Sequence, residues 1–158
     1  MRGKELLWAF LEQAALQVYV VTAEHEGTVG ALTASSVIPV SFEPPRMLAS
    51  IEKRARSHAA FLQARGFVIH LLAEDEVKIA EIMSSKLTPA EKLEAVGYER
   101  SPYGPVIKGA KSYLLLEKHA MFDAGDHTLF VGNVVEGRVG LVRRPLLYYS
   151  TGFTGVRA

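Results

Sequence analysis

Two long runs rich in strand-forming residues, joined by a short polar turn, constrain the fold of this chain most strongly. The runs are AKSYLLLEKHAMF at 110–122 and HTLFVGNVVEGRVG at 127–140, and the turn between them is DAGD at 123–126. Two such runs on either side of an Asp- and Gly-containing turn predict a long antiparallel β-hairpin. A hairpin of this length argues against a doubly wound parallel sheet and favours a small antiparallel barrel with helices outside it.

The other segments show short strands and helices in no regular alternation, within one domain over 1–158. A polar turn at 24–28 suggests a second hairpin, and the three prolines within 35–45 predict a loop or a bent strand there. Ser57 and Asp75 are candidate N-caps for the second and third helices. Strands are expected at 18–23, 28–34, 47–52, 67–72 and 145–150, and helices at 4–16, 58–65, 75–84 and 89–96.

Composition excludes several classes of function. The net charge is +1, which gives no general attraction to nucleic acid, and no cysteine is available for disulfides, iron–sulfur clusters or a thiol nucleophile. No apolar run approaches the ~20 residues of a membrane span. The N-terminal segment carries Glu5 and Glu12 and reads as a helix, not as a signal peptide. We therefore expect a cytoplasmic protein that binds neither membrane nor nucleic acid.

The familiar catalytic motifs are missing from the sequence. The five histidines have no spacing typical of a metal site, so zinc is a poor interpretation. No Gly-x-Ser-x-Gly elbow occurs, and neither a Gly-x-Gly-x-x-Gly loop nor a P-loop is present. The chemistry must therefore come from another kind of site.

A basic cluster at 53–57 is the strongest candidate for binding an anion. Arginine forks match phosphate geometry, and Ser57 adds a hydroxyl at an expected helix start, although most such charge runs are simply solvated loops. The cluster consists of Lys53, Arg54, Arg56 and Ser57.

Small residues precede this cluster, where a flat ring could lie against the backbone, although a tight turn would explain them equally well. They are Thr33, Ala34, Ser35 and Ser36. His127, in the turn of the long hairpin, is either merely exposed or contacts a second ligand.

The order of these elements resembles the flavin reductase-like family, whose fold is the FMN-binding split barrel. The resemblance covers about residues 16–150 and is carried by GALTASSVIPVSFEPP, RMLASIEKRARSHAAFL, FVIHLLAEDEVKIAE, GPVIKGAKSYLLLE, AGDHTLFVGNVVEG and PLLYYS. It implies a mainly β, Greek-key-like antiparallel barrel with peripheral helices. It also implies a homodimer that binds FMN, or alternatively FAD, without covalent attachment.

The resemblance assigns roles to particular residues. Thr33 to Ser36 match the loop that contacts the flavin ring and the ribityl–phosphate arm. Lys53, Arg54, Arg56 and Ser57 match the segment that binds the phosphate. His127 matches a histidine near the flavin face associated with the nicotinamide, and Tyr148 lies in a C-terminal strand that approaches the cofactor.

The implied activity is reduction of the flavin by NADH or NADPH, with the reduced flavin supplied to a separate oxygenase. Two alternatives stay open: a flavoprotein that retains FMN and transfers electrons to other acceptors, or a flavin-binding module without catalysis. The sequence departs from the family at Ala55, where serine is frequent, and at His70, where asparagine is common. The segment YYSTGF is one residue longer than usual, which leaves Tyr148 and Tyr149 as competing candidates for one role.

Overall fold

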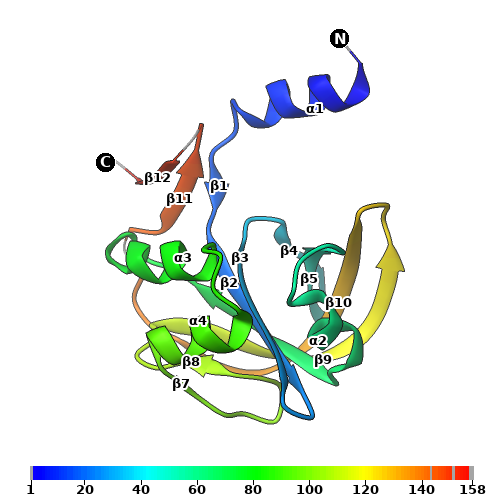
Figure 1. Ribbon diagram of the computed structural model, residues 1–158, viewed down its shortest axis with the longest axis vertical. Helices are drawn as coiled ribbons and strands as arrows, with labels where there is room; N and C mark the ends of the chain where they lie inside the picture. Colours follow the sequence, from blue (N-terminus) through cyan, green and yellow to red (C-terminus); the bar gives the residue numbers. More distant parts are fainter. Residues whose placement is uncertain (1, 143, 151, 157–158) are drawn as a thin grey trace.

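The computed structural model of the protein describes residues 2–142, 144–150 and 152–156 (Figure 1). Its helices are α1 (Gly3–Leu11), α2 (His58–Gln63), the 3-10 turn η1 (Glu74–Glu76), α3 (Val77–Met83) and α4 (Pro89–Val96). Its strands are β1 (Leu16–Gln17), β2 (Tyr19–His25), β3 (Thr28–Ala34), β4 (Val37–Phe42), β5 (Pro45–Glu52), β6 (Gly66–Leu71), β7 (Tyr98–Glu99), β8 (Val106–Ile107), β9 (Ser112–Asp123), β10 (His127–Val139), β11 (Leu146–Tyr149) and β12 (Gly152–Gly155).

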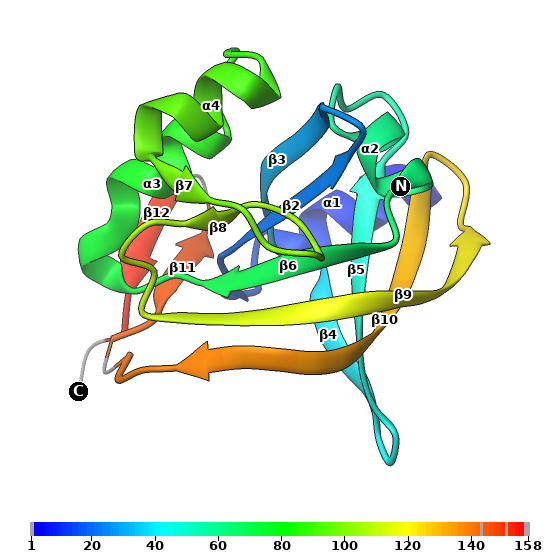
Figure 2. The ribbon, with the colours of Figure 1, turned by 90° about the horizontal axis from the view of Figure 1, so that it is seen from below.

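One seven-stranded antiparallel sheet forms the body of the molecule, in the order β3-β2-β6-β9-β10-β5-β4. Its two edge strands, β3 and β4, follow each other in the chain and are joined only by Ser35 and Ser36. Because a link this short cannot cross a flat sheet, the sheet must curl until its edges meet (Figure 2). The expected mainly β architecture with peripheral helices is confirmed, and the edges of the curled sheet meet at this link.

The hairpin predicted around the DAGD turn is confirmed. β9 and β10 pair antiparallel from Thr128 opposite Asp123 to Val139 opposite Ser112, with irregularities after Val131 and Val134. The β2–β3 hairpin is also confirmed. Its turn residues Glu26 and Gly27 have φ values of 47° and 84°, as a two-residue type I′ turn requires.

The proline-rich segment 35–45 is the bent strand that was one of its two predicted forms. β4 pairs with β5 at the sheet edge, and its register shifts between Pro39 and Ser41. An edge strand tolerates proline because one row of its backbone groups has no strand partner.

Two apolar clusters pack on opposite faces of β2, since side chains alternate along a strand. Val21 belongs to a cluster with Phe61, Phe67 and Phe130 that packs against α2. Val20 belongs to a second cluster, which includes Leu93 and packs against α3 and α4. The helices thus cover both faces of this part of the sheet.

Some local predictions were wrong. The first helix ends at Leu11, not near residue 16, and buries none of its residues. Asp75 does not cap a helix, because its carboxylate binds Lys111 Nζ at 2.7 Å. Strands β7, β8 and β12 were not anticipated, and their brevity gives too little periodicity to read. None of the helices in the described residues has the length and apolar character needed to cross a membrane.

His70 lies fully buried on β6 and uses both ring nitrogens. Nδ1 lies 3.0 Å from the Val20 carbonyl oxygen, and Nε2 accepts a hydrogen bond of 3.1 Å from the Ile107 amide. Because a carbonyl can only accept, Nδ1 carries the proton and the ring is neutral. Burial lowers the pKa of His70 to about 4, against the opposing effect of the Val20 hydrogen bond.

We therefore predict a loss of stability below neutral pH that depends on His70. The unfolded chain binds a proton near the ordinary histidine pKa, whereas the folded protein resists protonation down to pH about 4. The contribution of neutral His70 to the free energy of unfolding should be fully present above pH ~6.5. The free energy of unfolding should then fall as the pH decreases, by about 3 kcal/mol at pH ~4. Urea unfolding over this range, compared with His70→Asn, measures the effect. An equal pH slope in both proteins would contradict it.

Candidate functional site

The ladder between β5 and β10 brings together two predicted parts of the site that are far apart in the sequence. His127 at the start of β10 lies opposite Glu52 at the end of β5. Immediately beyond this pair, the Lys53 amide donates to the Asp126 carbonyl oxygen at 2.8 Å. The basic segment after β5 therefore leaves the sheet beside the turn that carries His127.

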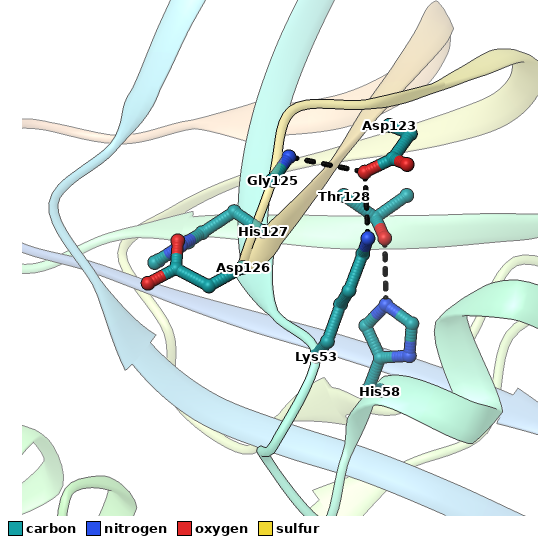
Figure 3. Close-up of polar contacts among 7 residues, drawn as sticks. All are labelled: Lys53, His58, Asp123, Gly125, Asp126, His127 and Thr128. Atoms are coloured by element: carbon teal, nitrogen blue, oxygen red, sulfur yellow. Dashed lines mark hydrogen bonds and ion pairs between the residues drawn. The ribbon is translucent and has the colours of Figure 1, made fainter.

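Lys53 is also bound to that turn through its side chain. Its Nζ lies 2.6 Å from Asp123 Oδ1, which also accepts a 3.0 Å hydrogen bond from the Gly125 amide (Figure 3). The hydrogen bond from Lys53 is the main reason that the pKa of Asp123 lies below its usual value. This pairing commits part of the Lys53 charge to holding the turn.

The two arginines of the cluster are exposed and form no ion pair within the described part of the chain. Arg56 makes one hydrogen bond, 3.3 Å from its guanidinium to the Lys86 carbonyl oxygen. Arg54 and Arg56 therefore retain more capacity for an external anion than Lys53 does.

His127 forms a pair with its neighbour Asp126. Its Nδ1 lies 2.8 Å from Asp126 Oδ1, and the two side chains project from the turn on the side away from Lys53 (Figure 3). Hydrogen bonding to His127 lowers the pKa of Asp126. Since the carboxylate can only accept, Nδ1 is the protonated nitrogen and Nε2 is left for another partner.

His58 is a neighbour that the sequence did not single out as part of the site. Its Nε2 lies 2.8 Å from Thr128 Oγ1 (Figure 3). Its ring packs edge-on against Phe130. Burial and then the charge of Lys53 lower the pKa of His58, which favours the neutral ring. Through Thr128, His58 fixes the start of α2 to the strand that carries His127.

The segment 33–36 forms the link between the sheet edges, and its four side chains differ in availability. Thr33 Oγ1 donates to the Ala80 carbonyl oxygen at 2.8 Å, and Ala34 is buried in the core. The Ser36 carbonyl oxygen accepts from the Ser50 amide at 3.0 Å. Within the described ranges, no hydrogen bond occupies the hydroxyls of Ser35 or Ser36, so these two and the backbone can contact a ligand.

Ser57 is the first residue before α2, as predicted, but its side chain does not cap the helix. Its buried hydroxyl accepts from the Ala31 amide at 2.8 Å and donates to the Ala31 carbonyl oxygen at 3.2 Å. These two bonds hold the α2 segment against β3. Contact between this hydroxyl and a phosphate stays a prediction.

Tyr148 is not brought to the other predicted residues within one chain. It lies in a separate small sheet of β1, β11 and β12, opposite Leu16, with its ring edge-on to Phe153 at 5.7 Å. Both ribbon views separate β11 from the β9–β10 turn.

A cleft of about 600 Å³ beside β11 and β12 is lined by residues such as Glu74 and Arg144 and by none of the predicted site residues. Thr151, in the YYSTGF segment, lies outside the described residues.

Lys92 is a charged residue near the site that the sequence analysis overlooked. It lies on the buried face of α4, and its Nζ reaches the Ala31 carbonyl oxygen of β3 at 3.3 Å. Its spacing of four residues from Val96 was the available signal, because residues four apart share one face of a helix.

Comparisons with known proteins identify the family of this arrangement. A model of the flavin reductase like domain matches residues 11–157. The reductase component of 4-nitrophenol 4-monooxygenase/4-nitrocatechol 2-monooxygenase from Rhodococcus opacus is 34% identical over 137 residues, which cover 86% of this chain and 72% of that protein. FMN reductase (NADH) SmoA from Agrobacterium fabrum is 36% identical over 121 residues, covering 75% of this chain and 67% of that protein.

Similarity to a solved structure extends over the whole chain. The native-state structure of the flavin reductase PheA2 has a TM-score of 0.85 and 27% sequence identity, and the match covers 100% of both chains. The fold, the extent of the family match and the level of identity agree. The protein belongs to the flavin reductase-like domain family.

Proposed function

We propose that this single-domain protein reduces FMN, or FAD, with NADH or NADPH and supplies the reduced flavin to a partner monooxygenase. The observation that carries the proposal is the β5–β10 ladder, which places the basic segment 53–57 beside the His127 turn in a chain of this family. The reductase component from Rhodococcus opacus supports the oxygenase partner by its name, and the FMN reductase (NADH) from Agrobacterium fabrum supports the choice of co-substrate.

The residues present fit a flavin phosphate. Arg54 and Arg56 are exposed and have no ion pair with a described carboxylate, as a site for an external anion requires. The hydroxyls of Ser35 and Ser36 lie at the link between the sheet edges, where small side chains allow a flat ring to approach the backbone. We therefore assign the ring end to the 33–36 link and the phosphate end to the segment 53–57.

The mechanism places few chemical demands on the protein. When bound, the flavin supplies the atom that accepts the hydride, and NADH or NADPH supplies the hydride. No side chain has to act as a nucleophile or strong base, so the protein contributes by holding the two rings in a reactive arrangement. His127, with Nδ1 bound to Asp126, presents Nε2 for a hydrogen bond that can orient the nicotinamide.

The proposal predicts that purified protein oxidises NADH or NADPH when FMN or FAD is added. Absorbance of the reduced nicotinamide, followed for each pairing against a blank without protein, measures this activity. Equal rates with and without protein for every pairing would contradict the proposal. Flavin retained through gel filtration, together with slow turnover, would instead identify a flavoprotein electron carrier.

His127→Ala should raise the KM for the nicotinamide, or slow flavin reduction, by about tenfold, the usual effect of losing one positioned hydrogen bond. The flavin dissociation constant should stay nearly unchanged, because the side chain projects away from Lys53 and is not one of the proposed phosphate-binding groups. Stopped-flow reduction and flavin fluorescence titration measure the two quantities separately. His25→Ala, in the distant β2–β3 hairpin, is the matched control. Loss of flavin affinity alone would rule out this role for His127.

Arg56→Ala should weaken FMN binding by about tenfold or more while leaving riboflavin binding unchanged, since riboflavin has no phosphate. Fluorescence titration with both flavins measures the difference. Arg65→Ala is the control, because that guanidinium lies 5.0 Å from the centre of the Tyr103 ring, outside the basic cluster. Equal weakening of both flavins would show that Arg56 maintains the fold and does not bind phosphate.

A homodimer is part of the proposal, and α1 is its best-supported contact surface. No α1 residue is buried, and Trp8 and Phe10 are 62% and 70% exposed on a helix that extends away from the body (Figure 1). Large exposed apolar patches of this kind mark association surfaces. Tyr148, remote from the site of its own chain, can approach a flavin only across such a dimer.

The dimer predicts a solution mass of about twice 17.3 kDa. Replacing Trp8 and Phe10 by glutamate should shift the mass towards one chain without unfolding it, because neither side chain contributes to the core. Gel filtration with light scattering measures the mass, and Lys4→Glu on the same helix is the control. A dimer unaffected by both glutamates would exclude α1 from the interface.

A further inference from the structure

Lys92 is a buried cation without a counter-charge. The residue is 8% exposed, and its Nζ makes one hydrogen bond, 3.3 Å to the Ala31 carbonyl oxygen, within the described residues. An ammonium group can donate three hydrogen bonds, and burying it without a partner is unfavourable. Burial and then the charge of Arg56 lower the pKa of Lys92, as expected for a cation that faces another cation and no anion.

Lys118 shows how the same fold satisfies a comparable lysine. Its Nζ donates to the carbonyl oxygens of Phe61 and Leu62 at 2.8 Å each and lies 5.9 Å from the centre of the Phe130 ring. Burial lowers the pKa of Lys118 as well. Lys118 therefore completes the end of α2, whereas Lys92 has unused donors.

Lys92 and Ser57, the neighbour of Arg56, bind the same carbonyl oxygen of β3. Lys92 comes from α4 and reaches the Ala31 carbonyl oxygen, which the Ser57 hydroxyl also binds at 3.2 Å. Arg56, next to Ser57, reaches the segment before α4 through the Lys86 carbonyl oxygen. Two positive groups thus lie together beside the strand that leads to the flavin-ring link.

The nearby carboxylate of Glu91 feels the charge of Arg56, but it forms no ion pair with Arg56 or Lys92 within the described residues. Glu91 Oε1 accepts from the Thr88 amide at 3.0 Å, and the Glu91 amide donates to Thr88 Oγ1 at 3.2 Å. This reciprocal capping box starts α4 and is the main reason that the pKa of Glu91 lies below its usual value. Because no ion pair in the described residues occupies Lys92 or Arg56, both side chains can still bind an anionic ligand.

We propose that Lys92 binds the flavin phosphate together with Arg56, which makes α4 a second arm of the phosphate site. This inference rests on the proposed function and adds a cofactor-binding residue from outside the segment 53–57. A phosphate between the two side chains would supply the missing counter-charge and accept the unused Lys92 hydrogens. Because Ala31 and the 33–36 link belong to one run of chain, β3 would then lie along the flavin from its phosphate to its ring.

The test compares Lys92→Met with Lys118→Met, since both replace a lysine that hydrogen-bonds backbone carbonyls, buried at Lys92 and half-buried at Lys118, by an apolar chain of similar length. Lys92→Met should weaken FMN binding by about 10- to 100-fold, the loss expected for a charge-assisted hydrogen bond, and leave riboflavin binding unchanged. Lys118→Met should bind both flavins as the wild type does and unfold at lower temperature, because it leaves two helix-end carbonyls unsatisfied. Lys92→Arg, which keeps the charge, should retain the preference for FMN.

The outcomes separate this inference from the proposed function. If the wild type binds FMN but Lys92→Met keeps its FMN affinity, or loses FMN and riboflavin affinity equally, Lys92 does not bind the phosphate and the proposed function stands. If the wild type binds no flavin, the proposed function is wrong and the inference about Lys92 falls with it. Inorganic phosphate should raise the unfolding temperatures of the wild type and of Lys118→Met by the same amount, and that of Lys92→Met by less. A smaller rise in Lys118→Met as well would mean that the two lysines are equivalent.

Discussion

The short link between β3 and β4 is the constraint on which the rest of this structure depends. Ser35 and Ser36 join the two edges of a seven-stranded sheet, so the sheet has to curl. Curling creates the enclosed apolar cluster around Phe61, Phe67 and Phe130. It also places the residues after β3 beside those of β5, where the Ser50 amide bonds the Ser36 carbonyl oxygen. The proposed ring end of the flavin site therefore lies at the short link that joins the two edge strands of the sheet.

Buried polar groups around this sheet mostly have an evident structural purpose. Neutral His70 joins β2 and β6 to β8, and His58 joins α2 to β10. Lys118 completes the end of α2. Lys92 differs because its buried ammonium group makes fewer hydrogen bonds to the described residues than it can donate. A protein interior retains such a group at a cost to stability, and binding of an anion is the simplest way for that cost to be offset.

Much of the fold was predictable because the signals are local. The DAGD turn between two apolar runs indicated β9 and β10, and the helix expected at 89–96 is α4. Predictions that depended on a single polar side chain were less reliable. Asp75 and Ser57 looked like helix caps, yet Lys111 and Ala31 are their actual partners. Both partners are distant in the sequence, so local chemistry could not reveal them.

The sequence by itself determined the longer strands, the two hairpins and the family resemblance, since periodicity, turn residues and their order are properties of neighbouring positions. Only the tertiary structure decided which charged side chains form ion pairs and which do not. Lys53 is committed to Asp123, whereas Arg56 and Lys92 lie close enough for Arg56 to lower the pKa of Lys92 and form no ion pair within the described residues. The physical reason is that the strength of a charge interaction depends on burial and on the distance to other charges, and both are set by segments that meet only when the chain folds.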